Sequence, residues 1–94
     1  MIVNANYKLN GRIDGSNADQ YDLEISALIN KVGPSFSIDL SELTYISSLG
    51  LRIFLKTAKD LKSQNKKLIL LKPNSEILDL LIMSGFDKII EIEK

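Results

Sequence analysis

The chain of 94 residues has no net formal charge, with 12 basic and 12 acidic residues, and it contains neither cysteine nor histidine. These absences exclude disulfides, zinc sites with the usual ligands, Ser-His-Asp triads and Cys-His dyads, and the balanced charge argues against a nucleic-acid binder that works by overall electrostatics. With 45% apolar and 26% charged residues, we expect one globular domain, residues 1–94, with a single modest core.

The N-terminal segment lacks the charged and then apolar pattern of a signal peptide. No apolar stretch approaches the roughly 20 residues that cross a bilayer. We therefore expect a cytoplasmic protein that does not associate with membranes.

The first predicted element is a strand at residues 6–13, where apolar side chains recur mostly at two-residue spacing and Gly11 interrupts the pattern. The short segment before it, "MIVN" at residues 1–4, is interpreted as a strand remnant.

A helix is expected to begin at Ser16 or Asn17, both suitable N-cap residues. Apolar residues at helical spacing continue to Val32. We expect the helix to end at Gly33-Pro34, because glycine takes the left-handed conformation that ends a helix and proline cannot continue one.

The remaining elements alternate in the same way. They are a strand at 35–40, a helix from 48 to about 63, a strand at 67–71, a helix from Pro73-Asn74 to about Met83, closed by Gly85 with Phe86 as its apolar contact, and a strand at 88–92. The order β-α-β-α-β-α-β predicts an α/β fold with a mixed, mostly parallel sheet and helical crossovers.

Basic residues gather along the second helix and just after it. Arg52, Lys56, Lys59, Lys62, Lys66 and Lys67 stand against one acid, Asp60. Such a face could meet nucleic acid, an acidic partner or anionic lipid. We favour a solvated surface whose late lysines complement the negative end of the helix dipole, because no aromatic residues interleave with the charges.

Two adjacent serines, Ser47 and Ser48, precede the second helix. Either hydroxyl can accept a hydrogen bond from a free N–H of the first turn, so capping is the ordinary role for both. The loop that follows a strand in a parallel sheet is also where α/β proteins hold their sites. Tyr45 and Ile46, just before the serines, are expected to pack at the edge of the core.

The segment from Ile38 to Leu70 resembles the core of the STAS domain, the fold of the bacterial anti-sigma factor antagonists. In that family a strand ending in Asp-Leu-Ser leads to an aromatic–apolar pair, and a "DSSGL" or "SSAGLR" segment then opens a helix. The matching residues here are Asp39-Leu40-Ser41, Tyr45-Ile46 and the segment "SSLGLR" from Ser47 to Arg52. Residues 9–19 and 80–92 resemble the family's "L.GrlD..na" and "l..sGl...i.i" segments, so the resemblance covers nearly the whole chain as a single STAS domain.

The resemblance implies a regulatory function. In antagonists of this family a serine of the motif is phosphorylated by the anti-sigma factor, itself a serine kinase that uses ATP. Anchored on Gly50, the matching serine is Ser48, where we expect capping and phosphorylation to coincide. Ser47 falls where the other motif variant has aspartate and is the second candidate. Asp14 matches a family aspartate near the same surface.

The unphosphorylated chain is accordingly expected to bind and sequester the kinase, and phosphorylation at Ser48 to release it. The expected partner surface consists of Asp14, Ser47, Ser48, Leu49, Gly50 and Arg52. In this scheme the chain is a substrate and not an enzyme, needs no cofactor or metal, contacts no nucleic acid directly, and is a monomer or weak dimer.

Two alternatives stay open. A STAS domain can also serve as a docking subunit of a transport or other regulatory complex without being phosphorylated, and Ser48 would then only cap its helix. A small enzyme could use carboxylates such as Asp14 and Asp39. We favour the enzyme least, because Asp39 lies at a predicted strand end, where a structural hydrogen bond accounts for it.

Overall fold

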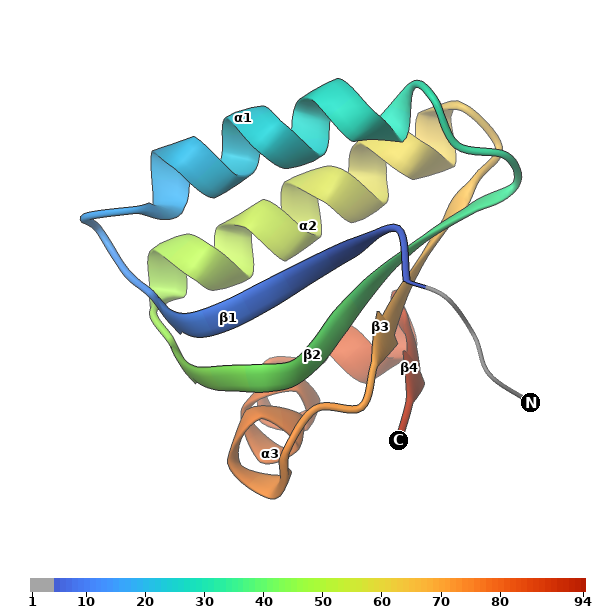
Figure 1. Cartoon of the computed structure of the whole chain (residues 1–94). Coiled ribbons are helices and arrows are strands. Elements are labelled where there is room, and N and C mark those ends of the chain that lie inside the picture. Colours follow the sequence, from blue (N-terminus) through green and yellow to red (C-terminus); the bar gives the residue numbers. More distant parts are fainter. Residues whose placement is uncertain (1–4) are drawn as a thin grey trace.

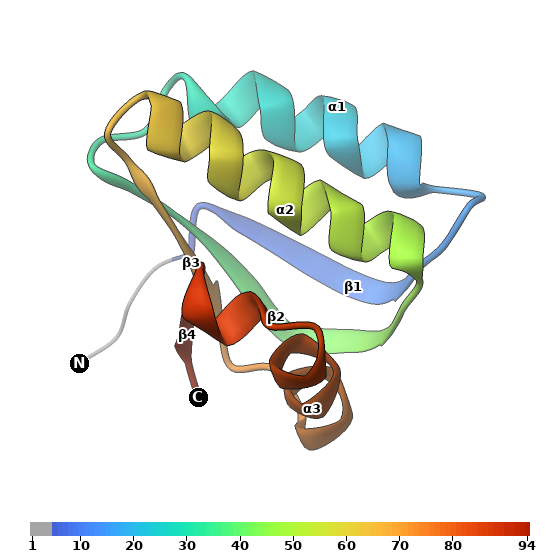
Figure 2. The same ribbon diagram turned by 180° about the vertical axis from the view of Figure 1, so that it is seen from behind.

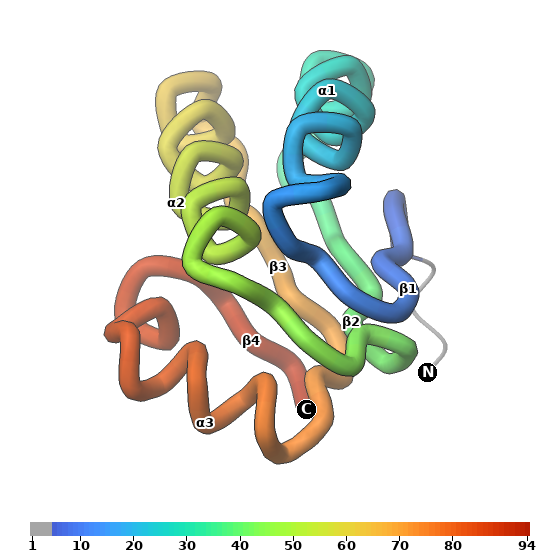
Figure 3. The backbone as a smooth tube through the Cα atoms, turned by 90° about the vertical axis from the view of Figure 1, so that its left-hand side faces the viewer, coloured from blue at the N-terminus to red at the C-terminus, as the bar shows by residue number. Residues whose placement is uncertain are grey.

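The computed structural model describes residues 5–94, so the strand remnant expected at 1–4 lies outside the described residues. One parallel sheet has the strand order β1-β2-β3-β4, formed by Tyr7–Ile13, Ser35–Ile46, Lys67–Leu71 and Glu91–Glu93. The crossovers are α1 (Ala18–Ile29), α2 (Ser48–Ser63) and α3 (Ser75–Met83), with a short 3-10 helix, η1 (Phe86–Lys88), before β4. Helices α1 and α2 lie side by side on one face of the sheet, and α3 covers the other (Figures 1 and 3). The α/β architecture and its element order confirm the prediction.

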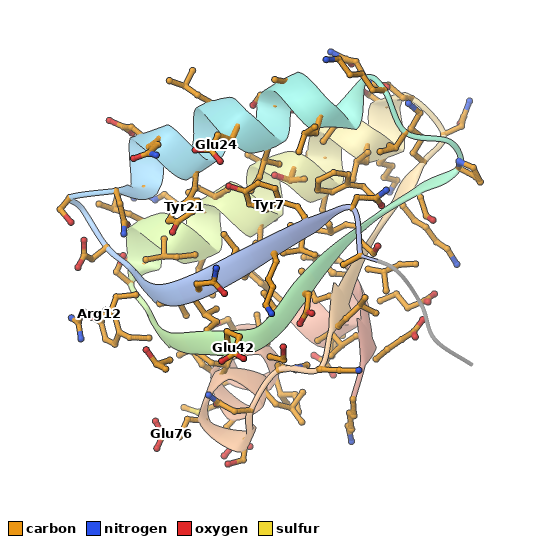
Figure 4. The ribbon with its side chains drawn as sticks, viewed as in Figure 1. Tyr7, Arg12, Tyr21, Glu24, Glu42 and Glu76 are labelled. Atoms are coloured by element: carbon orange, nitrogen blue, oxygen red, sulfur yellow. The ribbon has the colours of Figure 1, made fainter. Side chains whose placement is uncertain are left out.

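Strand β2 lies at the centre of the core. Phe36, Ser37 and Ile38 are buried in succession, as expected for a parallel strand covered on both faces. Phe54 and Leu61 of α2 are also part of this core and are completely buried. On α1, Glu24 accepts a hydrogen bond of 2.6 Å from the Tyr7 hydroxyl and so ties the helix to β1 (Figure 4).

Strand β2 runs six residues beyond the predicted end at Leu40, because two bulges hide its continuation. Lys8 lies opposite Asp39, Asn10 opposite Glu42, Gly11 opposite Leu43 and Arg12 opposite Tyr45, so β2 carries one extra residue at each of two steps. At each bulge the inward-facing residue comes one position later than strict alternation would place it. The buried residues in this part of β2 are therefore three apart, at Leu40, Leu43 and Ile46. The prediction that Asp39 lies at a strand end was therefore wrong.

Helix α1 ends earlier than predicted, at Ile29, and Asn30 occupies its C-cap position. Among residues 5–94, the glycines with positive φ are Gly11 (71°), at the second bulge of the β1–β2 pair, and Gly85 (76°). The left-handed conformation expected at Gly33 was wrong, since the chain leaves the helix three residues before it.

The last strand is shorter and later than predicted. Gly85 closes α3 as expected, but its left-handed turn leads into η1, where the Phe86 carbonyl accepts hydrogen bonds from Ile89 N (3.1 Å) and Ile90 N (2.8 Å). Phe86 is buried, as predicted. Residues 88–90 are therefore outside the sheet, and β4 begins at Glu91.

Candidate functional site

Two loops meet beyond the carboxyl ends of β1 and β2 (Figure 1). The first, residues 14–17, connects β1 to α1, and the second is the junction of β2 and α2 at Ser47. The Ser47 N–H donates a hydrogen bond of 2.9 Å to the Ile13 carbonyl, which joins the two strand ends directly. The structure thus brings Asp14 and the two serines to one edge of the sheet, where parallel α/β proteins place their sites.

The cap of α2 is Ser47. Its backbone is extended (φ −85°, ψ 174°), and its Oγ accepts a hydrogen bond of 3.4 Å from Gly50 N. Ser48 is the first residue of the helix, is exposed, and its hydroxyl enters no hydrogen bond among residues 5–94. The expectation that capping coincides with the candidate phosphoserine was therefore wrong, because the two roles fall on neighbouring residues.

Because Gly50 has no side chain, the first turn of α2 can pack closely against the ends of β1 and β2. A Cβ at this position would lie 2.5 Å from Ile46 Cγ1 and 2.9 Å from Ile13 Cγ2. Gly50 is buried, so of the expected partner-surface residues it is the one that a partner would not touch. Its role is to let the helix approach the sheet and so set where Ser48 is presented.

Leu49 gives the surface beside Ser48 an apolar side chain that is 43% exposed. Its Cδ1 lies 3.5 Å from the position of a Cβ on Gly15, so it leans over the β1–α1 loop. Leu49 and the exposed Arg52 line a shallow groove of about 470 Å³ between α1 and α2. An ion pair of 3.0 Å between Lys56 and Asp22 also borders this groove.

The Asp14 loop is held by its own side chains. The Asp14 carboxylate accepts hydrogen bonds from the Ser16 hydroxyl and from Ser16 N, the latter at 2.9 Å. These two bonds, with the Arg12 guanidinium nearby, lower the pKa of Asp14. Asn17 occupies the N-cap position of α1, but its side chain bonds Asp14 N and the Arg12 carbonyl and caps no helical N–H.

An Arg12–Tyr45 pair beside this loop was missed from the sequence. The Arg12 guanidinium carbon lies 4.3 Å from the centre of the Tyr45 ring, a cation–π distance, and its Nε lies 3.7 Å from the Asp14 carboxylate. Tyr45 is 43% exposed, so the expectation that it packs at the core edge was wrong, whereas Ile46 is buried as predicted. Only the bulged register, which places Arg12 opposite Tyr45, reveals the pair.

The carboxylates Asp14 and Asp39 do not form a catalytic pair. Asp39 lies opposite Lys8, near the start of β1, whereas Asp14 follows the end of that strand, a separation of about 20 Å at the rise of a strand. The pKa of Asp39 is lowered, mainly by a hydrogen bond from Ser41 N, and that of Asp14 is lowered too. A general acid of the kind the enzyme hypothesis needs would have a raised pKa.

Within residues 5–94, no group of three or more acidic, histidine or cysteine side chains could hold a metal ion. In the same part of the chain, no helix is both long and apolar enough to cross a membrane.

Residues 4–94 match the model of the STAS domain family. The chain is 35% identical over 78 residues to BtrV of Bordetella bronchiseptica, described as a candidate anti-sigma factor antagonist, with 83% of this chain and 67% of BtrV covered. It is 30% identical over 83 residues to the anti-sigma-B factor antagonist of Listeria monocytogenes, with 88% of this chain and 73% of that protein covered.

Solved structures share the fold. A candidate anti-sigma factor antagonist from Thermotoga maritima superposes with a TM-score of 0.83 at 22% identity, covering 93% of this chain and 77% of that one. The phosphorylated form of the Bacillus cell fate determinant SpoIIAA gives 0.71 at 19% identity, covering 100% and 88%. The STAS domain of a SulP transporter from Vibrio cholerae gives 0.71 at 13% identity, covering 94% and 70%.

Proposed function

Since the chain belongs to the STAS domain family, we propose that it is an anti-sigma factor antagonist controlled by phosphorylation at Ser48. In its unmodified form it binds and sequesters an anti-sigma factor that is a serine kinase. The kinase transfers the γ-phosphoryl group of ATP to Ser48 Oγ, the hydroxyl proton is lost, ADP leaves, and the complex separates. A cytoplasmic location and a monomeric or weakly dimeric state are part of the proposal.

The observation that carries the proposal is the difference between the two serines. Ser47 Oγ is engaged with Gly50 N, whereas Ser48 is exposed and its hydroxyl is unengaged among residues 5–94. A kinase must reach its acceptor hydroxyl, and Ser47 Oγ would first have to leave its hydrogen bond with Gly50 N. This favours Ser48 as the acceptor.

The fold tolerates a phosphate at Ser48. A phosphoserine brings about −1.5 to −2 charges at pH 7, and at the first residue of α2 these face the positive end of the helix dipole. The phosphate therefore leaves the domain folded, and the switch acts on the partner.

A partner fitted to the neutral hydroxyl would meet a bulky dianion beside Asp14, whose lowered pKa keeps it charged. Leu49 and the α1–α2 groove supply the apolar part of the surface that this partner would cover. An interface penalty of about 3 kcal/mol weakens binding more than a hundredfold, which is sufficient for release.

The test is a kinase assay with the cognate anti-sigma factor and ATP, read by intact mass and peptide mapping. We expect one phosphate on Ser48, lost in Ser48→Ala and retained in Ser63→Ala, a control at an exposed serine at the other end of α2. Ser47→Ala is expected to remain a substrate.

If the factor binds without modifying either serine, the phosphorylation switch fails and the docking-subunit hypothesis takes its place. If phosphate appears on Ser47, the assignment of the acceptor is wrong.

A further inference from the structure

In the part of the chain that the structure describes, helix α2 has an α-helix beside it on one flank only. Helix α1 runs along that flank, and the other faces η1 and the start of β4 (Figures 2 and 3). An open groove of about 720 Å³ lies on this second side, lined by the later turns of α2, the start of β3 and residues 87–91.

The floor of this groove is apolar. Leu55 and Ala58 of α2 are half-buried there, beside the buried side chains of Leu68 and Ile90. Ile89 also lines the groove and is 58% exposed. An isolated exposed isoleucine is ordinary, but one that adjoins an apolar hollow adds to a contiguous apolar surface.

The rim is basic, with five lysines and two carboxylates. These residues are Lys59, Lys62, Lys66, Lys67, Lys88, Asp87 and Glu91. Lys67 pairs with Glu91 at 3.0 Å, and Lys66 Nζ donates to the Ile29 carbonyl at 3.2 Å. None of the ion pairs formed within residues 5–94 includes Lys59, Lys62 or Lys88.

A solvated helix surface explains the exposed lysines, but it does not explain the apolar hollow between them. We propose that this basic groove binds an acidic amphipathic segment of a partner protein. The apolar side chains of the segment would lie on Leu55, Ala58 and Ile89, and its carboxylates would face the lysines of the rim. This is the helix-in-groove mode of recognition, with charge complementarity guiding the segment into place.

Other ligands fit the groove less well. No aromatic residue lines it, so the bases of a single-stranded nucleic acid would find nothing to stack on. A membrane surface would need apolar side chains that project, whereas most of the apolar surface here lies in a hollow.

The basic groove is separate from the Ser48 surface. Lys59 follows Ser48 by eleven residues in the same helix, which is about 16 Å at the helical rise. The inference therefore does not depend on the proposed function.

The probe for this inference is a synthetic peptide of about 16 residues, four to five helical turns, with leucines at i, i+3, i+4 and i+7 and glutamates beside them. Binding is measured by fluorescence anisotropy and mapped by NMR shifts of the labelled protein. We expect shifts at Ala58, Leu68 and Ile89, and an affinity that falls with added salt.

The triple variant Lys59→Glu, Lys62→Glu, Lys88→Glu is expected to bind the peptide at least tenfold more weakly. The matched control reverses the same number of exposed lysines away from the groove, at Lys8, Lys31 and Lys72, and should lose less than twofold. Circular dichroism checks that both variants are folded, and Ser48→Ala should bind like the parent.

The proposal is overturned if the two triple variants lose affinity equally, or if a peptide with lysines in place of the glutamates binds as well. It is also overturned if the probe shifts residues outside the groove, if it does not bind, or if duplex DNA or phosphatidylserine vesicles bind at the groove while the peptide does not.

Discussion

At the scale of single residues, Gly50 decides how closely α2 approaches the sheet. Replacing it with alanine would place a Cβ 2.5 Å from Ile46 Cγ1 and 2.9 Å from Ile13 Cγ2, atoms near the base of branched side chains that cannot swing away. We expect Gly50→Ala to lower the free energy of unfolding by about 1–3 kcal/mol, as overpacking does, even though alanine favours helix. Urea denaturation measures the change.

The matched control is Gly33→Ala, where a Cβ meets nothing within 4 Å and φ is not positive. This variant should be neutral or more stable by up to about 1 kcal/mol, since alanine narrows the unfolded ensemble. If the two variants change the free energy of unfolding equally, the close contact at Gly50 does not limit stability.

The two serines are expected to differ in stability as they do in geometry. Ser47→Ala removes the cap of α2 and should cost about 0.5–1 kcal/mol, the lower part of the usual range, because the Oγ to Gly50 N distance is long at 3.4 Å. Ser48→Ala should change stability by less than about 0.5 kcal/mol. Thermal denaturation distinguishes them, and a larger loss at Ser48 would contradict the cap assignment.

At the scale of elements, α2 is expected to be stabilised by phosphorylation. A phosphate on Ser48 would sit at the first residue of the helix, and Arg52 follows four residues later, the spacing at which side chains meet on a helix surface. We expect phosphorylated protein to melt at a slightly higher temperature, with a gain of about 0.5–1 kcal/mol.

In Arg52→Gln that gain should fall by a few tenths of a kcal/mol. Phosphorylation that lowers the melting temperature of the parent would contradict this account of the helix N-terminus.

The β1–α1 loop is expected to depend on pH through Asp14. Its folded pKa lies below its ordinary value, chiefly because of the Ser16 hydroxyl and next because of Ser16 N. A carboxylate with a depressed folded pKa adds stability above its unfolded pKa of about 3.9, and this is lost as the pH falls through the folded pKa. Ser16→Ala should raise the Asp14 pKa part of the way back in an NMR titration. An unchanged pKa would show that the hydroxyl is not the cause.

Elements with caps or strong periodicity could be predicted from the sequence. The bounds of α2 and β3 agree with the prediction, and Asn74 caps α3 by accepting a hydrogen bond from Ile77 N. Strand β2 could not be predicted beyond Leu40, because its two bulges replace the alternating pattern with a three-residue spacing. The segment "KIIEI" is rich in isoleucine, as strands are, yet the turn at Gly85 leads into η1, which ends at Lys88, and Ile89 and Ile90 stay outside the sheet.

Only part of the candidate site could be located from the sequence, and the roles of its residues could not. The motif located Ser47, Ser48 and Gly50, but the backbone angles of Ser47 were needed to assign the cap. Arg12 and Tyr45 meet only through the bulged register. The contact between two side chains 33 positions apart follows from strand pairing, which local sequence patterns do not encode.

At the scale of the whole molecule, α2 connects two surfaces of different character. Its N-terminal end presents Ser48 beside Asp14 and Leu49, and its later turns form one wall of the basic groove. The ends of α2 are tied to two neighbouring strands of the sheet, β2 and β3, so a charge added at Ser48 should alter the first surface and leave the groove unchanged.

The most direct test of the account compares the affinity of the cognate anti-sigma factor for the unmodified chain and for the chain phosphorylated at Ser48, by isothermal titration calorimetry. We predict a dissociation constant more than a hundredfold larger for the phosphorylated form, which corresponds to a loss of about 3 kcal/mol of binding free energy. Circular dichroism is expected to show that both forms are folded. Equal dissociation constants for the two folded forms would contradict the central claim that phosphorylation at Ser48 releases the partner.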